Sequence, residues 1–405
     1  MAWSIPKRVA FRFGFIAGLV FVFPFPIGLL PKTDWLAEQL NAPWEAFVCW
    51  FAQAVLGLDR PATEMTGSGD TTFAWVAFLV TLIVAAIGTV IWSVLDRKRT
   101  GYPRLAAGAL VVLRYVLAMT MLAYGFAKIV NTQFPFPNPT RLDGRIGDMS
   151  PMGLLWTFMG YSTPYTVFAG LCEALGAVLL LWRRTTLLGA LVIAAVMTNV
   201  VAMNLSYDVP VKLYSMQLLL LALIIATPHL RRVVAAVLGY ATPEVVPAPR
   251  MTRRHERARL VAKAVVVLSI ALHIYESVDE ASEYRDRTAP LGGIWAVETW
   301  TADGIEHPPL TTDAERWRKL AVNPHWATIR SMTDATTNVR IAVDEVARTL
   351  TVKTEIWRYS QPDPEHLVLD GVWSGHTLHV TLRLEPDPLL VTSGFHWIQE
   401  APLNR

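Results

Sequence analysis

The chain has 405 residues, of which 53% are hydrophobic and only 17% are charged. Soluble domains average about 25% charged residues, so this composition excludes an ordinary soluble protein. The net charge of +3 comes from short basic clusters beside apolar runs. Such clusters are typical of membrane topology signals and argue against a nucleic-acid-binding face.

Seven apolar runs are long enough to cross a bilayer, which takes about 20 residues. They cover residues 9–30, 72–94, 105–130, 164–182, 186–206, 211–227 and 259–276. The first run follows Lys7 and Arg8, as in a signal peptide, but its length and the lack of a clear cleavage site favour a retained helix. We therefore predict an α-helical membrane bundle of about seven helices over residues 1–277.

The loops between these runs differ in basic charge. Lys and Arg cluster in residues 7–8, 97–104, 183–184 and 231–259, whereas the alternate loops carry few. Basic loops stay in the cytoplasm, so the pattern predicts a cytoplasmic N-terminus and a C-terminal domain outside it, in the cytoplasmic (inner) membrane. Residues 36–55 form an extra amphipathic segment, which we expect to be a helix along the outer membrane surface or packed over the bundle.

Charged side chains inside spans are costly and tend to face a bundle interior or a cavity. Arg114 and Glu173 lie near the middle of the third and fourth runs, so we expect a buried Arg114–Glu173 pair, with a structural or a functional role. Lys128 follows Arg114 by nearly four helical turns and shares its face. It either snorkels to the headgroups or faces a cavity.

Other polar residues approach the same outer level of the bundle. The predicted cavity-lining candidates are Tyr124, Asn199, Asn204, Tyr207, Asp208 and His273. Cys49 and Cys172 are far apart and in no CxxC or zinc-ligand spacing, which favours two unrelated thiols and no metal site.

Three stretches resemble the DoxX-like membrane proteins. Leu113–Leu117 followed by Tyr124–Lys128 has that family's arginine and Gly-x-x-Lys pattern. Gly170–Gly176 with the basic turn Arg183–Thr185 is similar to its second helix, and Met203–Leu213 fits the remainder. The resemblance covers residues 105 to about 230 and implies a four-helix unit there.

DoxX-like proteins are associated with membrane redox systems, including a thiosulfate:quinone oxidoreductase, and many have no assigned activity. The unit is also distantly similar to the membrane domain of vitamin-K-dependent γ-carboxylases, which has such a lysine at a quinone site and an extracytoplasmic β domain. The resemblance implies a non-covalently bound quinone, with Lys128 as a base or hydrogen-bond donor facing it. The different length argues against carboxylase activity, and the missing CxxC argues against thiol–disulfide chemistry.

The C-terminal residues change to a period of two, which is typical of strands. After a linker at 278–290, we predict an antiparallel β-barrel or sandwich at 291–405, with a hairpin at Ser374-Gly375. Gly293-Ile294-Trp295 is similar to the opening of lipocalin-like barrels. The tail Gly394–Arg405 either docks on the outer mouth of the membrane domain or is a last strand with a short end.

Two functions remain open. The first is a membrane oxidoreductase component that binds a quinone in its helices and a small-molecule substrate or exported protein through its β domain. The alternative is a non-catalytic accessory or maturation protein that recruits an exported partner. A transporter is less favoured because no inverted repeat or pair of broken helices is apparent. The sequence leaves open whether the protein is an enzyme. Its predicted partners include the lipid bilayer but no nucleic acid.

Overall fold

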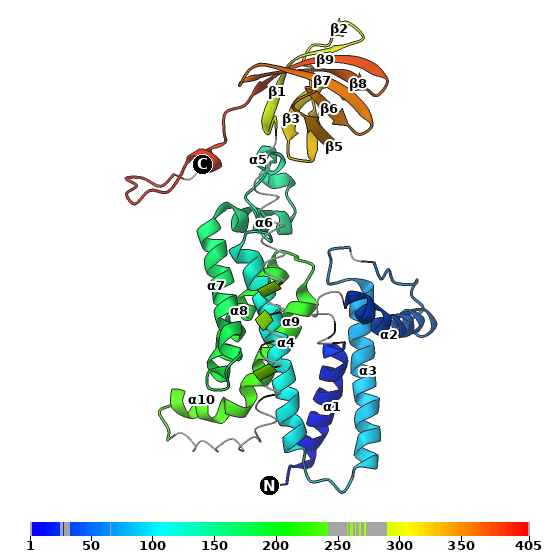
Figure 1. Ribbon diagram of the computed structural model, residues 1–405, viewed down its shortest axis with the longest axis vertical. Helices are drawn as coiled ribbons and strands as arrows, with labels where there is room; N and C mark the ends of the chain where they lie inside the picture. The colour runs from blue at the N-terminus through cyan, green and yellow to red at the C-terminus, as the bar shows by residue number, and fades with distance from the viewer. Residues whose placement is uncertain are drawn as a thin grey trace. The chain divides into compact units, whose positions relative to one another are not determined.

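The computed structural model describes residues 2–24, 27, 33–64, 66–241 and 290–403, and helical positions 257, 260, 261, 264, 267, 268, 271 and 272. Contacts divide the chain into two units. The helical unit comprises Met1–Phe134 and Ser162–Ala281, and the barrel unit comprises Pro135–Tyr161 and Ser282–Arg405. Figure 1 shows the ribbon of both.

The helical unit contains long apolar helices and short connecting ones. They are α1 (Ile5–Val22), α2 (Asp34–Ala54), α3 (Thr72–Leu95), α4 (Pro103–Ile129), α7 (Thr163–Leu180), α8 (Thr186–Ser206), α9 (Lys212–Ala226), η3 (Thr227–His229) and α10 (Leu230–Val237). Among the described residues, five runs are long and apolar enough to cross a bilayer: α3, α4, α7, α8 and the run Lys212–Val237. The chain is therefore an integral membrane protein, as its composition predicted.

The first predicted span is shifted toward the N-terminus. α1 has 18 residues, from Ile5 to Val22, and includes Lys7, Arg8 and Arg12. Arg12 is buried, and its guanidinium donates to the Tyr102 hydroxyl and to Ser93 Oγ, at 2.7 Å each. These bonds satisfy a charge that would otherwise be costly in this apolar helix. The seventh predicted span, 259–276, lies largely outside the described residues.

The amphipathic segment at 36–55 is the helix α2, as predicted. In Figure 1 it runs crosswise to α3. Val48 and Ala52 of α2 pack against Val76 and Val80 of α3, and all four are buried. The apolar stripe of α2 is thus at least partly a packing surface within the helical unit.

Helices α4, α7 and α8 approach one another closely because glycines line their contacts. A Cβ added to Gly125 of α4 would lie 2.8 Å from the carbonyl oxygen of Gly170 in α7. One added to Gly189 of α8 would lie 2.7 Å from the carbonyl oxygen of Gly176. Small residues let membrane helices pack backbone to backbone, which fixes the register of this part of the bundle.

The barrel unit contains a closed antiparallel barrel of eight strands: β1 (Gly293–Ala302), β3 (Trp317–Val322), β4 (Trp326–Ser331), β5 (Thr336–Asp344), β6 (Thr349–Val352), β7 (Glu355–Asp363), β8 (His366–Trp373) and β9 (His376–Leu384). Sequential strands pair, β9 closes on β1, and the short β2 (Ile305–Glu306) pairs with β1 alone. The predicted hairpin is confirmed: Trp373 pairs with His376, and Ser374 and Gly375 both have positive φ, as a two-residue turn of this kind requires.

Side chains fill the barrel interior. Trp295, Trp357, Leu367, Val380 and other apolar residues form one buried core, and the remaining internal void is only about 20 Å³. This space admits little more than one water molecule, so the interior holds no ligand of substrate size. The lipocalin-like opening therefore marks a packed core strand here.

Two further parts complete this unit. The segment 135–161 contains α5 (Pro139–Asp143), η2 (Ile146–Asp148) and α6 (Pro151–Tyr161), and it groups with the barrel although it falls between α4 and α7 in sequence. At the other end, β9 stops at Leu384, and the tail after α12 (Leu389–Thr392) exposes Phe395 and Trp397. The tail is therefore not the last barrel strand.

Candidate functional site

A buried ion pair joins α4 to α7. The Lys128 ammonium lies 2.9 Å from Oε2 of Glu173, and the two side chains are 9% and 3% exposed. Ionised side chains at such positions are costly unless they are paired and hydrogen-bonded. Among the described residues, this is the ion pair whose two partners both lie within candidate membrane spans.

The predicted Arg114–Glu173 pair is wrong, and helix register is the reason. Gly125 faces Gly170 and Ala174, so α7 runs antiparallel to α4 with Glu173 near the Lys128 end. Arg114 lies eleven residues before Gly125, about 16 Å further along the helix axis. The ends of the apolar runs predict equal depths for Arg114 and Glu173. The register of α7 against α4 is set instead by the glycine contacts between the two helices.

Arg114 is buried at the level of the α7–α8 turn instead. Its Nη1 donates to the Thr186 hydroxyl at 3.2 Å, and its guanidinium lies 5.1 Å from the ring centroid of Tyr115. Thr186 in turn donates to the Trp182 carbonyl oxygen. These contacts tie the start of α8 to α4 and indicate a structural role for Arg114.

Aromatic rings enclose the Lys128 ammonium. It lies 5.7 Å from the ring centroid of Tyr124 and 5.9 Å from that of Phe134, within the range of cation–π attraction. Lys128 is buried and held by Glu173, so snorkelling does not describe it. Tyr124 itself is 38% exposed, so its ring forms the accessible side of this enclosure.

A large cavity lies elsewhere in the helical unit. It has a volume of about 1010 Å³ and is lined by residues of α1, α2, α3 and α9, with Leu113 from α4. Its lining is mostly apolar, including Gly14 and Gly18 of α1, and its polar side chains include Asn41, Tyr214 and Gln217. Tyr214 and Gln217 lie in the first two turns of α9, so these two polar groups mark one end of the cavity.

The predicted cavity-lining residues do not line this cavity. Tyr124, Asn199, Asn204, Tyr207 and Asp208 are absent from its wall. His273 lies outside the described residues. The prediction rests only on the depth of each residue in the membrane. The direction in which a side chain points also depends on the rotation of its helix about the helix axis.

Two asparagines of α8 show this effect. Asn199 is exposed because it follows the buried Ile193 by six residues, about 240° around the helix. Asn204 is buried on the Ile193 face, and its Nδ2 has no hydrogen-bond partner. Asn204 therefore belongs to the helix contact and not to the cavity.

The loop after α8 is fixed by an acidic residue that precedes α3. Asp70 accepts hydrogen bonds from the backbone N–H groups of Lys212 and Leu213, at 2.8 and 3.0 Å. It thereby caps the N-terminus of α9, where a carboxylate is favourable. Asp208 is exposed and pairs with the Lys212 ammonium at 2.7 Å, so this residue is a loop group.

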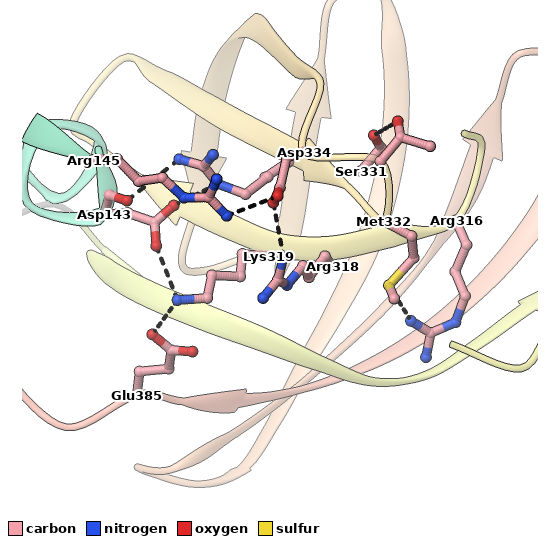
Figure 2. A network of polar contacts seen from close by, with 11 residues as sticks. Asp143, Arg145, Arg316, Arg318, Lys319, Ser331, Met332, Asp334 and Glu385 are labelled. Atoms are coloured by element: carbon pink, nitrogen blue, oxygen red, sulfur yellow. Dashed lines mark hydrogen bonds and ion pairs between the residues drawn. The ribbon is translucent and has the colours of Figure 1, made fainter. Parts of the chain in front are cut away.

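In the barrel unit, charged side chains hold the segment 135–161 on the outside of the barrel (Figure 2). Asp143 accepts from the Lys319 ammonium and from Arg330 Nε, at 2.9 Å each, and Lys319 also contacts Glu385 at 2.7 Å. Burial disfavours the charged form of Lys319 and lowers its pKa. The hydrogen bonds to Glu385 and Asp143 have a larger combined effect, so the pKa of Lys319 is raised. Arg145 adds an exposed pair with Asp334.

Comparison with known proteins places the chain in a family. The family model for DoxX matches residues 109–206. The uncharacterised protein YwoB of Bacillus subtilis is 38% identical over 112 residues, which are 28% of this chain and 71% of YwoB. The chain belongs to the DoxX family. No solved structure matches it.

The DoxX match begins within α4 and ends at Ser206, the last residue of α8. It contains Arg114, Lys128 and Glu173, and also the segment 135–161. The large cavity is formed mostly by helices outside this stretch. Tyr214, Gln217 and Asp143 were missed by the sequence reasoning, because each acts through contacts between segments distant in sequence.

Proposed function

We propose that this DoxX-family protein is a membrane redox component that binds a lipid-soluble quinone in its helical unit. The observation that carries the proposal is the buried Lys128–Glu173 ion pair. Charged groups inside a membrane domain are retained at a cost and commonly mark ion, proton or ligand sites. A quinone suits such a site because, when bound, it supplies an acceptor for two electrons and two protons.

The geometry of the pair supports a donor role for Lys128 in this proposal. Lys128 Nζ donates a hydrogen bond to Glu173 Oε2 at 2.9 Å, so in this arrangement its remaining N–H groups can donate to a ligand. We therefore assign Lys128 as the donor and Glu173 as the group that orients it. The base role inferred from the family resemblance would require the pair to open first.

The large cavity fits the apolar part of such a ligand. Its volume of about 1010 Å³ reaches the upper end of the range of about 300–1,000 Å³ for small-molecule sites, and its lining is mostly apolar. Tyr214 and Gln217 would hold polar groups of the ring. The proposal requires the quinone ring to reach from Tyr214 toward Tyr124, whose ring centroid lies 5.7 Å from the Lys128 ammonium.

Quinone content of the purified protein tests the proposal. Lipids extracted from the wild type should contain close to one quinone per chain by mass spectrometry. Lys128→Met should lose it through the missing donor, and Gly14→Trp should lose it by filling the cavity, since a Cβ at Gly14 meets nothing within 4 Å. Gly108→Trp is the matched control, because Gly108 has equal space but does not line the cavity.

The outcomes separate the alternatives. Repeated absence of quinone from folded wild type would refute the proposal and favour the non-catalytic accessory protein. Quinone retained by Lys128→Met but lost by Gly14→Trp would leave the cavity as the site and remove Lys128 from it.

We also propose that the N-terminus is cytoplasmic and that the barrel lies outside, in the cytoplasmic membrane, where it binds a substrate or partner. The basic loops support this orientation. A reporter fused after Arg405 should be active only outside the cytoplasm, and one inserted at residues 97–104 only inside. Cytoplasmic activity of the C-terminal fusion would refute the orientation.

A further inference from the structure

Helix α10 turns away from the bundle at the end of α9. Pro228 in η3 has no backbone N–H, so the hydrogen-bond ladder of α9 is interrupted there. In Figure 1, α10 extends sideways from the end of α9, across the direction of the long helices. Residues 212–229 alone provide the roughly 17–25 residues that a crossing takes, so α10 is not needed to span the membrane.

One side of α10 is apolar and exposed. Leu230, Val234 and Val237 are separated by four and three residues, so they lie along one face of the helix. They are 55%, 46% and 78% exposed, and none of the eight residues of α10, all of which the structure describes, is buried. A helix this short is not stable in water by its own propensity, so its apolar face needs a cover that excludes water.

The preceding helix indicates what this cover is. Leu223 of α9 is also exposed, and it lies in a candidate membrane span, where lipid chains surround such a side chain. Leu230 follows Leu223 by only seven residues, so α10 begins at the boundary of the same lipid layer. An amphipathic helix that turns sideways at this level lies in the membrane interface with its apolar face toward the acyl chains.

The other side of α10 is basic. Arg231 and Arg232 lie about 100° and 200° around the helix from Leu230. The sequence has no acidic residue between Asp208 and Glu244, so no near neighbour along the chain neutralises these two arginines. Nε of Arg232 is also buried and has no hydrogen-bond partner among the described residues. The basic side of α10 therefore calls for an anionic acceptor from outside this part of the chain.

Further positive charge lies at the same end of the bundle. Helices α8 and α9 pack against each other and are joined by the short loop 207–211, so they run in opposite directions. The start of α8 and the end of α9 therefore lie at one end. Arg183 and Arg184, in the turn before α8, are exposed there. Basic clusters beside a span or on an amphipathic helix are typical of binding sites for anionic lipids.

We propose that α10 lies in the membrane interface and binds the headgroups of anionic phospholipids. Its apolar face enters the boundary of the acyl chains, and Arg231 and Arg232 donate charge-assisted hydrogen bonds to phosphate oxygens. A soluble acidic partner would also suit the arginines, but it would leave the apolar face beside them in water. The inference concerns the lipid contacts of the chain and is independent of the quinone.

The position of α10 can be measured in the full-length protein in lipid nanodiscs. Val234→Cys and Ala236→Cys would each be labelled with bimane, and the wild type, whose Cys49 is buried and Cys172 half-buried, gives the background. Both positions are exposed, but they differ by about 200° around the helix. A lipid that is spin-labelled near its headgroup should quench position 234 more strongly than 236, and aqueous iodide should do the reverse.

Lipid selectivity tests the role of the arginines. Native mass spectrometry of protein released from nanodiscs of equal phosphatidylglycerol and phosphatidylcholine should show retained phosphatidylglycerol. Each basic side chain near an anionic surface adds roughly fivefold to binding, so Arg231→Gln with Arg232→Gln should lower this preference by up to roughly 25-fold. Arg97→Gln with Lys98→Gln is the matched control and should keep the preference, because these exposed residues lie in the turn after α3 and not on α10.

Three results would overturn the proposal. If the spin-labelled lipid quenches positions 234 and 236 equally, or quenches neither, α10 does not lie in the interface as described. An unchanged preference in the α10 double variant would remove its arginines from lipid binding. An equal loss in both double variants would mean that the overall charge of the protein, and not α10, attracts the lipid. Quinone content should be unchanged in the α10 double variant, so failure here is distinct from failure of the quinone proposal.

Discussion

Removal of one partner from the Lys128–Glu173 pair should strongly destabilise the helical unit. With an effective dielectric constant of about 20, Coulomb's law gives an attraction of about 6 kcal/mol at the 2.9 Å separation of the two atoms. Desolvation opposes this attraction, so the pair itself is worth less. Lys128→Met nevertheless leaves the Glu173 carboxylate, whose side chain is only 3% exposed, without its partner. Removing one partner of a buried ion pair lowers the free energy of unfolding by about 3–5 kcal/mol.

A double-mutant cycle isolates the interaction. Unfolding of Lys128→Met, Glu173→Gln and the double variant would be followed by circular dichroism during titration with SDS in mixed micelles. The double variant should be more stable than the sum of the single losses predicts, by at least about 1.5 kcal/mol, because it carries no unpaired charge. A second cycle on Arg114 and Glu173 is the control and should be additive within about 0.5 kcal/mol.

The refuting result is additivity in the first cycle. Independent losses at Lys128 and Glu173 would mean that the two charges do not meet in the membrane, and the donor role assigned to Lys128 would lose its basis. Coupling in the Arg114 cycle alone would instead support the register predicted from the apolar runs.

Three further predictions concern packing and the barrel. Asp143→Asn should destabilise the barrel unit by about 2–3 kcal/mol, because it weakens two charged hydrogen bonds, and hydrogen exchange of the barrel amides measures the loss. Gly125→Ala should lower folded yield sharply since its Cβ would meet a backbone oxygen at 2.8 Å, whereas Gly108→Ala, with open space, should be nearly neutral in the same assay. The hydrogen bond to Asp303 raises the pKa of His376, and the same bond lowers that of Asp303. The wild-type barrel should therefore melt at a higher temperature than the His376→Gln variant between about pH 4 and 6.5. This difference should disappear as pH rises through the raised His376 pKa, or as pH falls through the lowered Asp303 pKa. A difference that does not change with pH would contradict the ion pair.

The sequence by itself determined the class of the protein and most of its elements. Runs of about 20 apolar residues must lie in lipid, and strands of period two must pack one face inward, so α3, α4, α7, α8 and the barrel follow from local patterns. The hairpin at Ser374-Gly375 follows from the turn chemistry of two residues. Local order of this kind needs no knowledge of which segments meet.

The tertiary structure alone decided the partners. Lys128 meets Glu173 because glycines at 125 and 170 set the register of α4 and α7, which hydropathy does not encode. The packing of α1, α2, α3 and α9 likewise created the cavity away from the residues that depth had suggested. Asp143 reaches Lys319 across 176 positions of sequence, so the grouping of residues 135–161 with the barrel arises from side-chain contacts that no local pattern contains.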